Sequence, residues 1–450
     1  MPAYKTPGVY VEEISTLPPS VAEVSTAIPA FIGYTETGPK IARVSTLLEF
    51  EQLFGGPKPA VFTIATDADG NVKTVTRGAA ASASTSAEPA YILYYAVSHY
   101  FKNGGGACYI VSAGNFGSTP SKADITAALG VLEQEDEPTL IVLTDAVNLA
   151  TVDYHELCQS SLAQCAKLGD RFAILDVKKD GEAGKSDAEV FRGGVGTNAL
   201  SYGAAYYPYL ETSLTYAYDE NTVSIQPVTG SAVTLASIKT TNTALYNQIK
   251  TALAAQRITL PPSAAVAGIY ASVDRSRGVW KAPANVSVAA VVGPVTKLTN
   301  DAQESLNIDP TAGKSINAIR AFTGKGTLVW GARTLAGNDN EWRFISVRRL
   351  FSMIEESTRK ATDFAVFESN DMTTWLKVKG TVESFLYGLW ERGALAGATP
   401  AAAYFVNVGL GKTMTTQDVL EGRMIVEIGV AAVRPAEFIV LRFTHKLQEA

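Results

Sequence analysis

The sequence contains three histidines, His99, His155 and His445. Histidine is the side chain that changes charge near neutral pH. A serine hydrolase needs one histidine beside a nucleophilic serine and an orienting carboxylate. His99 and His155 fall within predicted helices, where a structural histidine is the usual case, and His445 lies in a predicted terminal strand. The sequence also has no Gly-x-Ser-x-Gly turn, which presents the serine in α/β-hydrolases. The pattern therefore predicts no hydrolase triad.

Three tripeptides resemble the end of a phosphate-binding loop. They begin at Gly184, Gly313 and Gly411 and continue with lysine and then serine or threonine. The complete motif needs another glycine five residues earlier, so that backbone amides can surround the phosphates. Those positions hold Lys179, Ile308 and Val406, so we interpret the tripeptides as ordinary turns. Residues 193–196 are rich in glycine. A dinucleotide-binding turn would follow a strand, and no clear strand precedes these residues.

The cysteines and acidic residues do not form a metal-binding pattern. Cys108, Cys158 and Cys165 are odd in number and include no Cys-x-x-Cys pair, which predicts buried free thiols in a reducing compartment. No group of histidines and cysteines has the spacing of metal ligands. The acidic run at 133–137 precedes a proline and is interpreted as a solvated loop. We therefore predict no catalytic residue, no cofactor and no metal.

Composition and charge limit the class of protein further. The 450 residues suffice for two to four domains, and 46% hydrophobic residues with 18% charged ones indicate a large core. The net charge of −6 lacks the basic surface of a nucleic-acid binder. The first residues show no signal-peptide pattern, and no apolar run approaches the roughly 20 residues of a membrane helix. We expect assembly in the cytoplasm, no nucleic-acid partner and no direct membrane insertion.

The middle of the chain alternates between strand and helix patterns. Apolar runs of strand length occupy residues 30–34, 108–111, 139–144 and 171–177. Helical patterns occupy residues 90–102, 121–133 and 152–168. Continuous apolar strands separated by helices indicate an α/β layer structure with a largely parallel sheet.

Two segments interrupt this alternation. Residues 66–89 are rich in Ala, Ser, Thr and Asp without periodicity, and they predict a surface insertion. In residues 212–240, Thr, Tyr, Val and Ser alternate around positions 219–221, which indicates a β-hairpin. A helix is predicted after it, over residues 242–256.

The last third is predicted to contain two amphipathic helices. One apolar stripe consists of Val347, Leu350, Phe351, Ile354 and Thr358, and the other of Trp375, Val378, Val382, Phe385 and Leu389. Spacings of three and four place each stripe on one helical face, which is normally a core face. Asn370 or Asp371 can cap the start of the second helix, and Gly393 can end it.

Both ends of the chain carry strand patterns. In residues 7–14, Val9 and Val11 share one face and Tyr10 lies on the other. In residues 437–448, one face carries Ile439, Leu441 and Phe443, and the other carries Val440 and Arg442. A terminal strand with unpaired edges is a hazard in a monomer, but it can connect subunits in an array.

Several segments together resemble the contractile tail sheath family of myophage tails and extracellular contractile injection systems. They lie, in chain order, at 7–13, 28–33, 261–271, 274–285, 316–320, 329–334, 343–350, 367–371 and 434–438. The run Gly278-Val279-Trp280-Lys281-Ala282-Pro283-Ala284-Asn285 lies within the most specific of these matches. The resemblance spans nearly the whole chain and is weakest at 57–89 and 212–256.

The resemblance implies a fold and a division into domains. An N-terminal arm and linker would occupy 1–25, and an α/β core with a subtilisin-like middle portion, lacking a triad, would occupy 26–345. The core would carry insertions near 57–89 and 212–256. An α+β C-terminal sheath domain facing the inner tube would occupy 346–436, and a C-terminal strand arm 437–450.

The resemblance also implies a mechanical function without enzymatic activity. Sheath subunits stack as hexameric rings around an inner tube in a metastable extended state, and contraction drives the tube through a target envelope. The implied partners are further copies of the chain, the inner tube, baseplate and terminator or cap proteins, and sheath paralogues where a particle has several. The implied location is a virion tail or a released injection particle. Val9, Tyr10, Val11 and residues 439–443 would form the inter-subunit strands. An α/β hydrolytic enzyme and another structural tail component are the alternatives.

Overall fold

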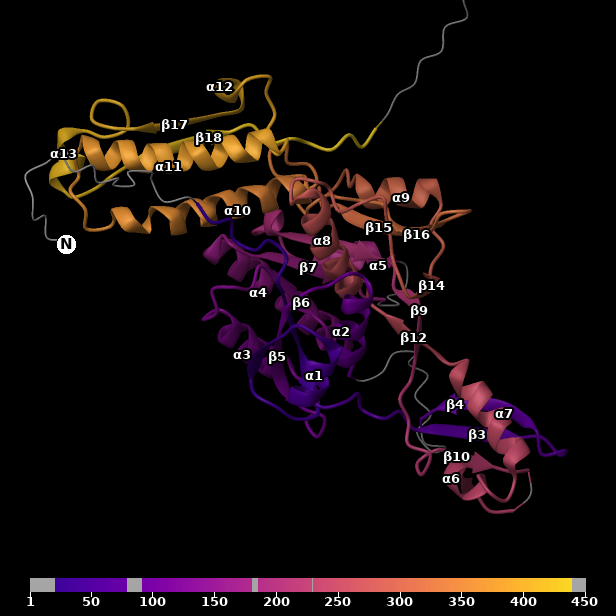
Figure 1. The fold of residues 1–450 in the computed structure, drawn as a ribbon. Coiled ribbons are helices and arrows are strands. Elements are labelled where there is room, and N and C mark those ends of the chain that lie inside the picture. The colour runs from indigo at the N-terminus through magenta and orange to yellow at the C-terminus, as the bar shows by residue number, and fades with distance from the viewer. Residues whose placement is uncertain (1–20, 79–90, 180–184, 229, 439–450) are drawn as a thin grey trace, which may run out of the picture. The chain divides into compact units, whose positions relative to one another are not determined.

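A computed structural model describes residues 21–78, 91–179, 185–228 and 230–438 (Figure 1). These residues divide into two compact units. The larger unit contains residues 25–353 and 434–438, and the smaller unit contains residues 21–24 and 354–433.

A nine-stranded sheet forms the centre of the larger unit, in the order β13-β16-β15-β8-β7-β6-β1-β5-β2. Its strands are β1 (Pro29–Thr35), β2 (Ile41–Val44), β5 (Cys108–Asn115), β6 (Leu140–Leu143), β7 (Phe172–Asp176), β8 (Gly203–Tyr207), β13 (Val286–Ser287), β15 (Ile316–Phe322) and β16 (Gly326–Val329). The six strands from β15 to β5 are parallel, and β2, β16 and β13 pair antiparallel at the two edges. The largely parallel sheet predicted from the apolar runs is therefore confirmed.

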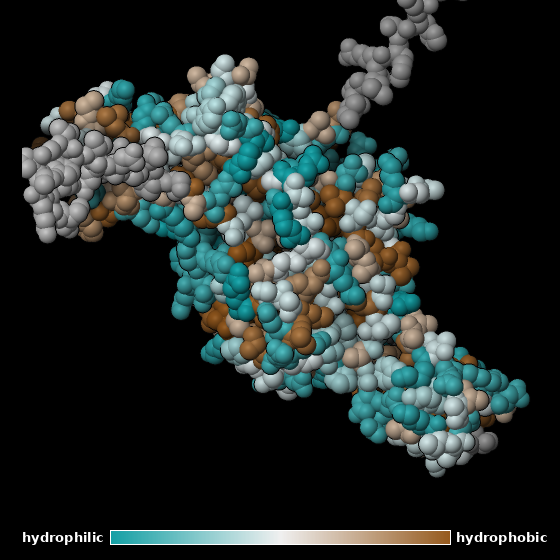
Figure 2. All heavy atoms as spheres, in the orientation of Figure 1, coloured by the Kyte–Doolittle hydropathy of each residue, from teal (hydrophilic) through white to brown (hydrophobic). Residues whose placement is uncertain are grey.

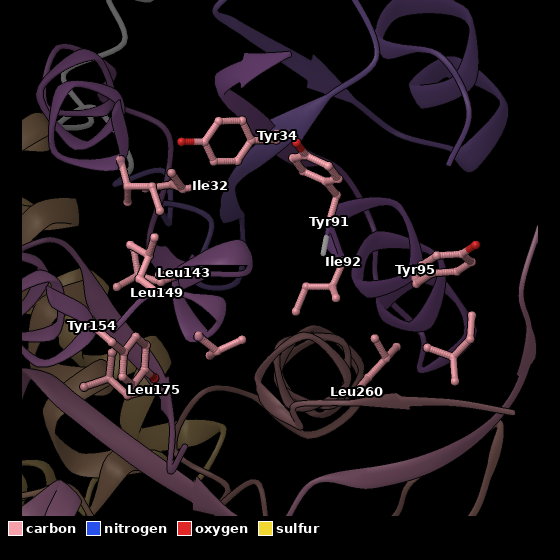
Figure 3. Packing of buried hydrophobic residues seen from close by; sticks show 14 of the residues in the cluster. Ile32, Tyr34, Tyr91, Ile92, Tyr95, Leu143, Leu149, Tyr154, Leu175 and Leu260 are labelled. Carbon is pink, nitrogen blue, oxygen red and sulfur yellow. The ribbon is translucent and has the colours of Figure 1, made fainter. Parts of the chain in front are cut away.

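Helices cover both faces of this sheet, which explains why its strands are apolar without alternation. The face that carries Phe31 packs against α1 (Leu47–Phe54), α2 (Leu93–Lys102) and α8 (Ser263–Arg277). The face that carries Ile32 packs against α3 (Lys122–Leu132), α4 (Thr151–Leu168) and α5 (Asp187–Gly194). Figure 3 shows part of this second cluster, in which the rings of Tyr34 and Tyr91 meet edge to face at 5.7 Å between centroids. Short helices η1 (Asp145–Asn148), η2 (Leu200–Tyr202) and α9 (Asn300–Asn307) complete this part of the chain.

A separate four-stranded sheet contains part of the first predicted insertion. It has the order β11-β10-β3-β4, with β3 (Phe62–Thr66), β4 (Val72–Arg77), β10 (Ser224–Gln226) and β11 (Val233–Thr234). Helices α6 (Leu235–Ile238) and α7 (Thr243–Ala254) follow it in the chain. The strand β4 lies in the segment that showed no periodicity, because it is a mostly exposed edge strand with little apolar alternation. Residues 79–90 lie outside the described residues.

The predicted hairpin around positions 219–221 is wrong. The strand before it, β9 (Leu210–Thr215), pairs with β12 (Arg257–Leu260) and β14 (Val291–Pro294) in a third sheet. The strand after it, β10, pairs with β3 and β11. The Asp219 carboxylate accepts a hydrogen bond from the backbone N–H of Asn221 at 2.9 Å, so this turn is local and connects two sheets rather than two paired strands.

The two amphipathic helices of the last third are confirmed. They are α10 (Ile345–Thr362), which passes from the larger unit into the smaller one, and α11 (Met372–Glu391). Asp371 caps α11 by accepting the Thr374 N–H at 3.0 Å, and Gly393 follows the helix at a φ of 80°. Four of the five stripe residues of α11 are buried and Trp375 is partly buried, and the helix packs against β17 (Tyr404–Val408). The smaller unit also contains η3 (Asp363–Ala365), α12 (Pro400–Ala403), α13 (Thr416–Leu420) and β18 (Val426–Val430).

Candidate functional site

The carboxyl edge of the parallel sheet is the place where α/β proteins usually bind ligands. Asp145 lies there, two residues beyond β6, and is fully buried. Its carboxylate accepts hydrogen bonds from the backbone N–H groups of Tyr34 and Ile92, both at 2.6 Å. Gly33 leaves room for it, because a Cβ at this position would lie 2.6 Å from an Asp145 oxygen. Asp145 therefore ties the start of α2 to the sheet.

A second buried carboxylate, Asp176, ends β7 and has a similar structural role. It accepts hydrogen bonds from the Ser263 N–H at 2.8 Å and from the Ser263 hydroxyl at 2.6 Å, at the first residue of α8. Burial raises the pKa of Asp145 and of Asp176 to about 7, while their hydrogen bonds act in the opposite direction. Both side chains anchor helix starts, and their donors are backbone amides and one hydroxyl.

The predicted histidine and cysteine roles can be compared with the structure. His99 is buried, its Nε2 lies 3.0 Å from the Ala289 carbonyl oxygen, and desolvation lowers its pKa to about 4. It is therefore neutral at pH 7. Cys108, Cys158 and Cys165 are free and buried, as predicted, and burial raises the pKa of each thiol. Among the described residues, no three His, Cys, Asp or Glu side chains are grouped as metal ligands.

Side chains of the three phosphate-loop-like tripeptides bond within the chain. Ser186 caps α5. Lys314 donates to the Arg192 carbonyl oxygen at 2.5 Å. Thr413 donates to the Ile425 carbonyl oxygen at 2.6 Å. Gly184 lies outside the described residues. These bonds agree with the interpretation of the tripeptides as turns.

The eight predicted arm residues lie outside the described residues. They are Val9, Tyr10, Val11, Ile439, Val440, Leu441, Arg442 and Phe443. The structure does describe the chain next to each arm, at residues 21–26 and 434–438. We call these two segments the arm roots.

The N-terminal arm root is attached to the larger unit by a buried ion pair. The Thr26 hydroxyl donates to the Asp274 carboxylate at 2.6 Å, and the Thr26 carbonyl oxygen accepts from Arg349 at 2.9 Å. Arg349 also binds both oxygens of Asp274, at 2.5 and 3.2 Å, and lies 4.5 Å from the centre of the Tyr270 ring. Both charged side chains are at least 94% buried. A paired, planar guanidinium of this kind holds the segment in one geometry.

The C-terminal arm root has an equivalent attachment. Arg333 binds the Glu437 carboxylate through Nη2 at 2.5 Å and Nε at 3.0 Å. Asn317 positions Arg333, since its Oδ1 accepts the Arg333 N–H and its Nδ2 donates to the Arg333 carbonyl oxygen, both at 2.8 Å. Gly331 must be small there, because a Cβ would lie 2.7 Å from the Asn317 Oδ1.

Sequence reasoning missed both ion pairs, although all four charged residues lie in the segments that carry the family resemblance. The partners are 75 and 104 residues apart in the chain, so neither pair shows in a local pattern.

The smaller unit has unusual exposed surfaces. Within the described residues, β17 and β18 pair only with each other, so each strand has one edge without a neighbouring strand. Nine of the nineteen exposed large apolar side chains of the described residues lie within 354–433, a much smaller part of the chain than the larger unit. Free strand edges and exposed apolar side chains mark surfaces that bind other chains.

The described helices include none that is both long and apolar enough to cross a lipid bilayer.

Comparisons with known proteins match most of the chain to sheath proteins. The family model for the phage tail sheath protein central domain matches residues 197–335, and that for the phage tail sheath C-terminal domain matches residues 337–446. The tail sheath protein of Vibrio phage KVP40 is 24% identical over 192 residues, which are 42% of this chain and 27% of that protein. The tail sheath protein of Enterobacteria phage T4 is also 24% identical, over 41% of this chain and 27% of its own length. The match thus spans about a quarter of these curated relatives.

Solved structures match over the whole length of the chain. The sheath of an extracellular contractile injection system, the PVC sheath complex in the contracted state, is 30% identical with a TM-score of 0.69. This match covers 100% of this chain and 99% of that one. A chain of the contracted anti-feeding prophage (AFP) baseplate is 28% identical with a TM-score of 0.71, over 99% of this chain and 100% of its own. The chain belongs to the contractile tail sheath family.

Proposed function

We propose that this chain is the structural sheath subunit of a contractile injection particle or phage tail. The observation that carries the proposal is the similarity to the PVC sheath, at 30% identity over the full length of both chains. A match of this length includes both units and both arm roots, rather than one shared domain.

In this proposal, subunits stack as hexameric rings around an inner tube in a metastable extended state. Contraction then drives the tube through a target envelope with energy stored at assembly. The proposed partners are further copies of the chain, the inner tube, baseplate and terminator or cap proteins, and sheath paralogues where the particle has them. Solved relatives described as a sheath complex, a helical sheath and a baseplate support these partners. Residues 346–436 would face the inner tube.

The terminal arms would connect the subunits. Residues 7–14 and 437–447 would each add a strand to a sheet in the smaller unit of a neighbouring copy. The free edges of β17 and β18 support this proposal, because an added strand gains backbone hydrogen bonds along such an edge. The ion pairs at the arm roots also support it, since a connecting arm must be fixed firmly to its own subunit.

The proposal assigns no enzymatic activity. The relatives are structural sheath proteins, and the buried Asp176 and Ser263 at the carboxyl edge of the sheet bond to each other as a helix anchor. An α/β hydrolase finds no support in this arrangement.

Assembly without a cofactor tests the proposal. We expect the purified protein to form rings, stacked tubes or long helical sheaths in buffer alone, visible by negative-stain electron microscopy. A protein that stays monomeric at high concentration would contradict the proposed function.

A further inference from the structure

The two arginines that hold the arm roots are joined by one short hairpin of the larger unit. Arg333 binds Glu437 in the C-terminal arm root, and Arg349 binds the Thr26 carbonyl oxygen in the N-terminal one. Between these arginines the chain turns back on itself, and we call residues 332–345 the root hairpin. The two attachments are therefore close along the chain, although the arms are at its opposite ends.

Hydrogen bonds join the two limbs of the root hairpin. Arg333 forms an antiparallel bridge with Phe344. The next residue, Thr334, donates its N–H to the Arg343 carbonyl oxygen and its hydroxyl to the Trp342 carbonyl oxygen, both at 2.8 Å. Thr334 is fully buried, so water does not compete for these bonds. We therefore expect the two limbs to move together.

The root hairpin is also bonded to the start of α10, which carries Arg349. The Phe344 carbonyl oxygen accepts the N–H groups of Val347 and Arg348, both at 3.1 Å, in the first turn of the helix. The Arg348 guanidinium lies 4.3 Å from the centre of the Trp342 ring, which belongs to the hairpin. Because Arg349 is the next residue, a displacement of the hairpin is passed on to it.

The burial of both arginines supplies a force for such a displacement. Hydrophilic residues are spread over the visible face of the larger unit in Figure 2, whereas the side chains of Arg333 and Arg349 are only 5% and 3% exposed. When either arginine loses its carboxylate, Glu437 or Asp274, an unpaired charge remains in the interior, which is strongly destabilising. The guanidinium then moves towards water, and its backbone moves the hairpin with it.

The chemistry of the two attachments also favours a device that responds to release. An apolar pair of similar volume is often at least as stable as a buried ion pair. An ion pair differs from it in one respect, because removal of one partner strongly destabilises the other. Two buried ion pairs joined by one hairpin can therefore report the loss of either arm root to the other.

We propose that the root hairpin couples the two arm roots, so that release of one arm root weakens the attachment of the other. The coupling is reciprocal, as any linkage between two equilibria must be. Its role rests on the proposed function: where arms join the copies of an array, a pull on one arm of a subunit passes through the root hairpin to its other arm.

Thiol labelling of the monomeric full chain tests the coupling directly. Ala27 packs against the core beside Thr26, and the native cysteines are buried, so Ala27→Cys gives a thiol whose labelling reports opening of the N-terminal arm root. In this background, Glu437→Gln should raise the labelling rate at position 27 by about fivefold or more. Glu137→Gln, which removes an exposed ion pair with Arg43, should leave the rate unchanged. Equal rates with and without Glu437→Gln would overturn the proposal.

A double-mutant cycle on the equilibrium constant of unfolding tests reciprocity. The effects of independent sites multiply to within a factor of about two. We expect the variant with both Glu437→Gln and Asp274→Asn to be less destabilised than the product of the single effects by about fivefold or more, since release of one root already loosens the other. Thr26→Val, which removes only one hydroxyl donor, replaces Asp274→Asn if that variant does not fold. Multiplicative effects would refute the coupling.

Thr334→Val tests the part played by the root hairpin, because it removes the hydroxyl bond between the limbs. We expect it to bring the effects of the double variant closer to the product. Thr212→Val is the matched control, since Thr212 is also fully buried and donates to the Ile258 carbonyl oxygen at 2.7 Å in another sheet. Equal results for the two valine variants would show that the hairpin does not carry the coupling. Uncoupled roots in a chain that still forms tubes refute this inference alone, whereas a wild type that forms no tubes refutes the proposed function.

Discussion

Asp176 is a carboxylate that the fold keeps away from water, at the end of β7. Its pKa in the folded chain is about 7, compared with 3.8 for an exposed aspartate, because burial disfavours the charged form. The folded state therefore retains a proton that the unfolded chain loses between these two values. The stabilising contribution of this proton is complete below the unfolded pKa and is lost as the pH rises through about 7.

We expect Asp176→Asn to raise the free energy of unfolding at pH 8 by about 1–3 kcal/mol, and by much less at pH 5, where Asp176 is already protonated in the folded protein. Asparagine can accept the Ser263 N–H and donate to the Ser263 hydroxyl, so it keeps both bonds. Urea unfolding of the monomer at pH 5, 6, 7 and 8 measures the effect.

Asp145→Asn is the matched control for this substitution. Asp145 accepts hydrogen bonds only from backbone N–H groups. The NH₂ group of an asparagine would face one of these N–H donors, so Asp145→Asn should destabilise the protein at both pH values. The same change in stability at pH 5 and pH 8 for Asp176→Asn would show that the titration of this group does not affect folding.

The sequence predicted well those helices and strands in which all residues of a strand, or of one helical face, have the same burial. β1, β6 and β7 are recognisable as strands because helices cover both their faces, so every position is buried and most positions are apolar. α11 was predicted with its caps because its stripe packs on one sheet. β4 and β10 were missed or mispaired, since short strands at and near the edge of a small sheet have little apolar pattern, and β10 pairs with β3 about 160 residues earlier in the chain.

The ion pairs at the arm roots were unpredictable for a related reason. A charged residue in a sequence indicates an exposed position by default, and only the fold brings Arg333 to Glu437. Because both side chains of each pair are largely buried, we expect a sizeable coupling energy between them, which a double-mutant cycle can measure.

We expect Arg333→Met and Glu437→Gln to show a coupling energy of about 2–3 kcal/mol in a double-mutant cycle on the free energy of unfolding. Each single substitution leaves one buried charge without its counter-charge, whereas the double variant leaves no unpaired charge. The exposed pair Lys379–Glu383 on α11 serves as a control, with an expected coupling of about 0.3–0.5 kcal/mol. Additive effects of Arg333→Met and Glu437→Gln would mean that the pair does not hold the arm root.

In the whole molecule, the buried polar groups described above and the exposed edges of β17 and β18 lie in different units. The larger unit buries Asp145, Asp176 and the three cysteine thiols and fixes both arm roots, while the smaller unit exposes strand edges and apolar side chains. A subunit that must remain folded while its neighbours move needs both properties. In the proposed function, the larger unit carries the arms and the smaller unit accepts the arms of other copies.

The arms themselves can be tested with a substitution that leaves the body unchanged. Leu441→Pro removes one backbone N–H and distorts a strand, so we expect the monomer to fold normally and the tubes to be lost. An added strand would contribute about 0.5–1.5 kcal/mol for each ladder hydrogen bond and about 1.5–3 kcal/mol for each buried apolar side chain. Circular dichroism measures folding, and electron microscopy measures assembly.

Leu441→Ala separates the two contributions, because alanine removes the apolar contact but keeps the N–H. If backbone pairing dominates, the alanine variant assembles at a higher concentration than the wild type, whereas the proline variant does not assemble at all. A truncation after Phe438 keeps Glu437 and its ion pair with Arg333, and it removes residues 439–450, which include most of the strand proposed to pair with a neighbour. Contractile tubes formed by the proline variant or by this truncated chain would show that the C-terminal arm does not connect the subunits.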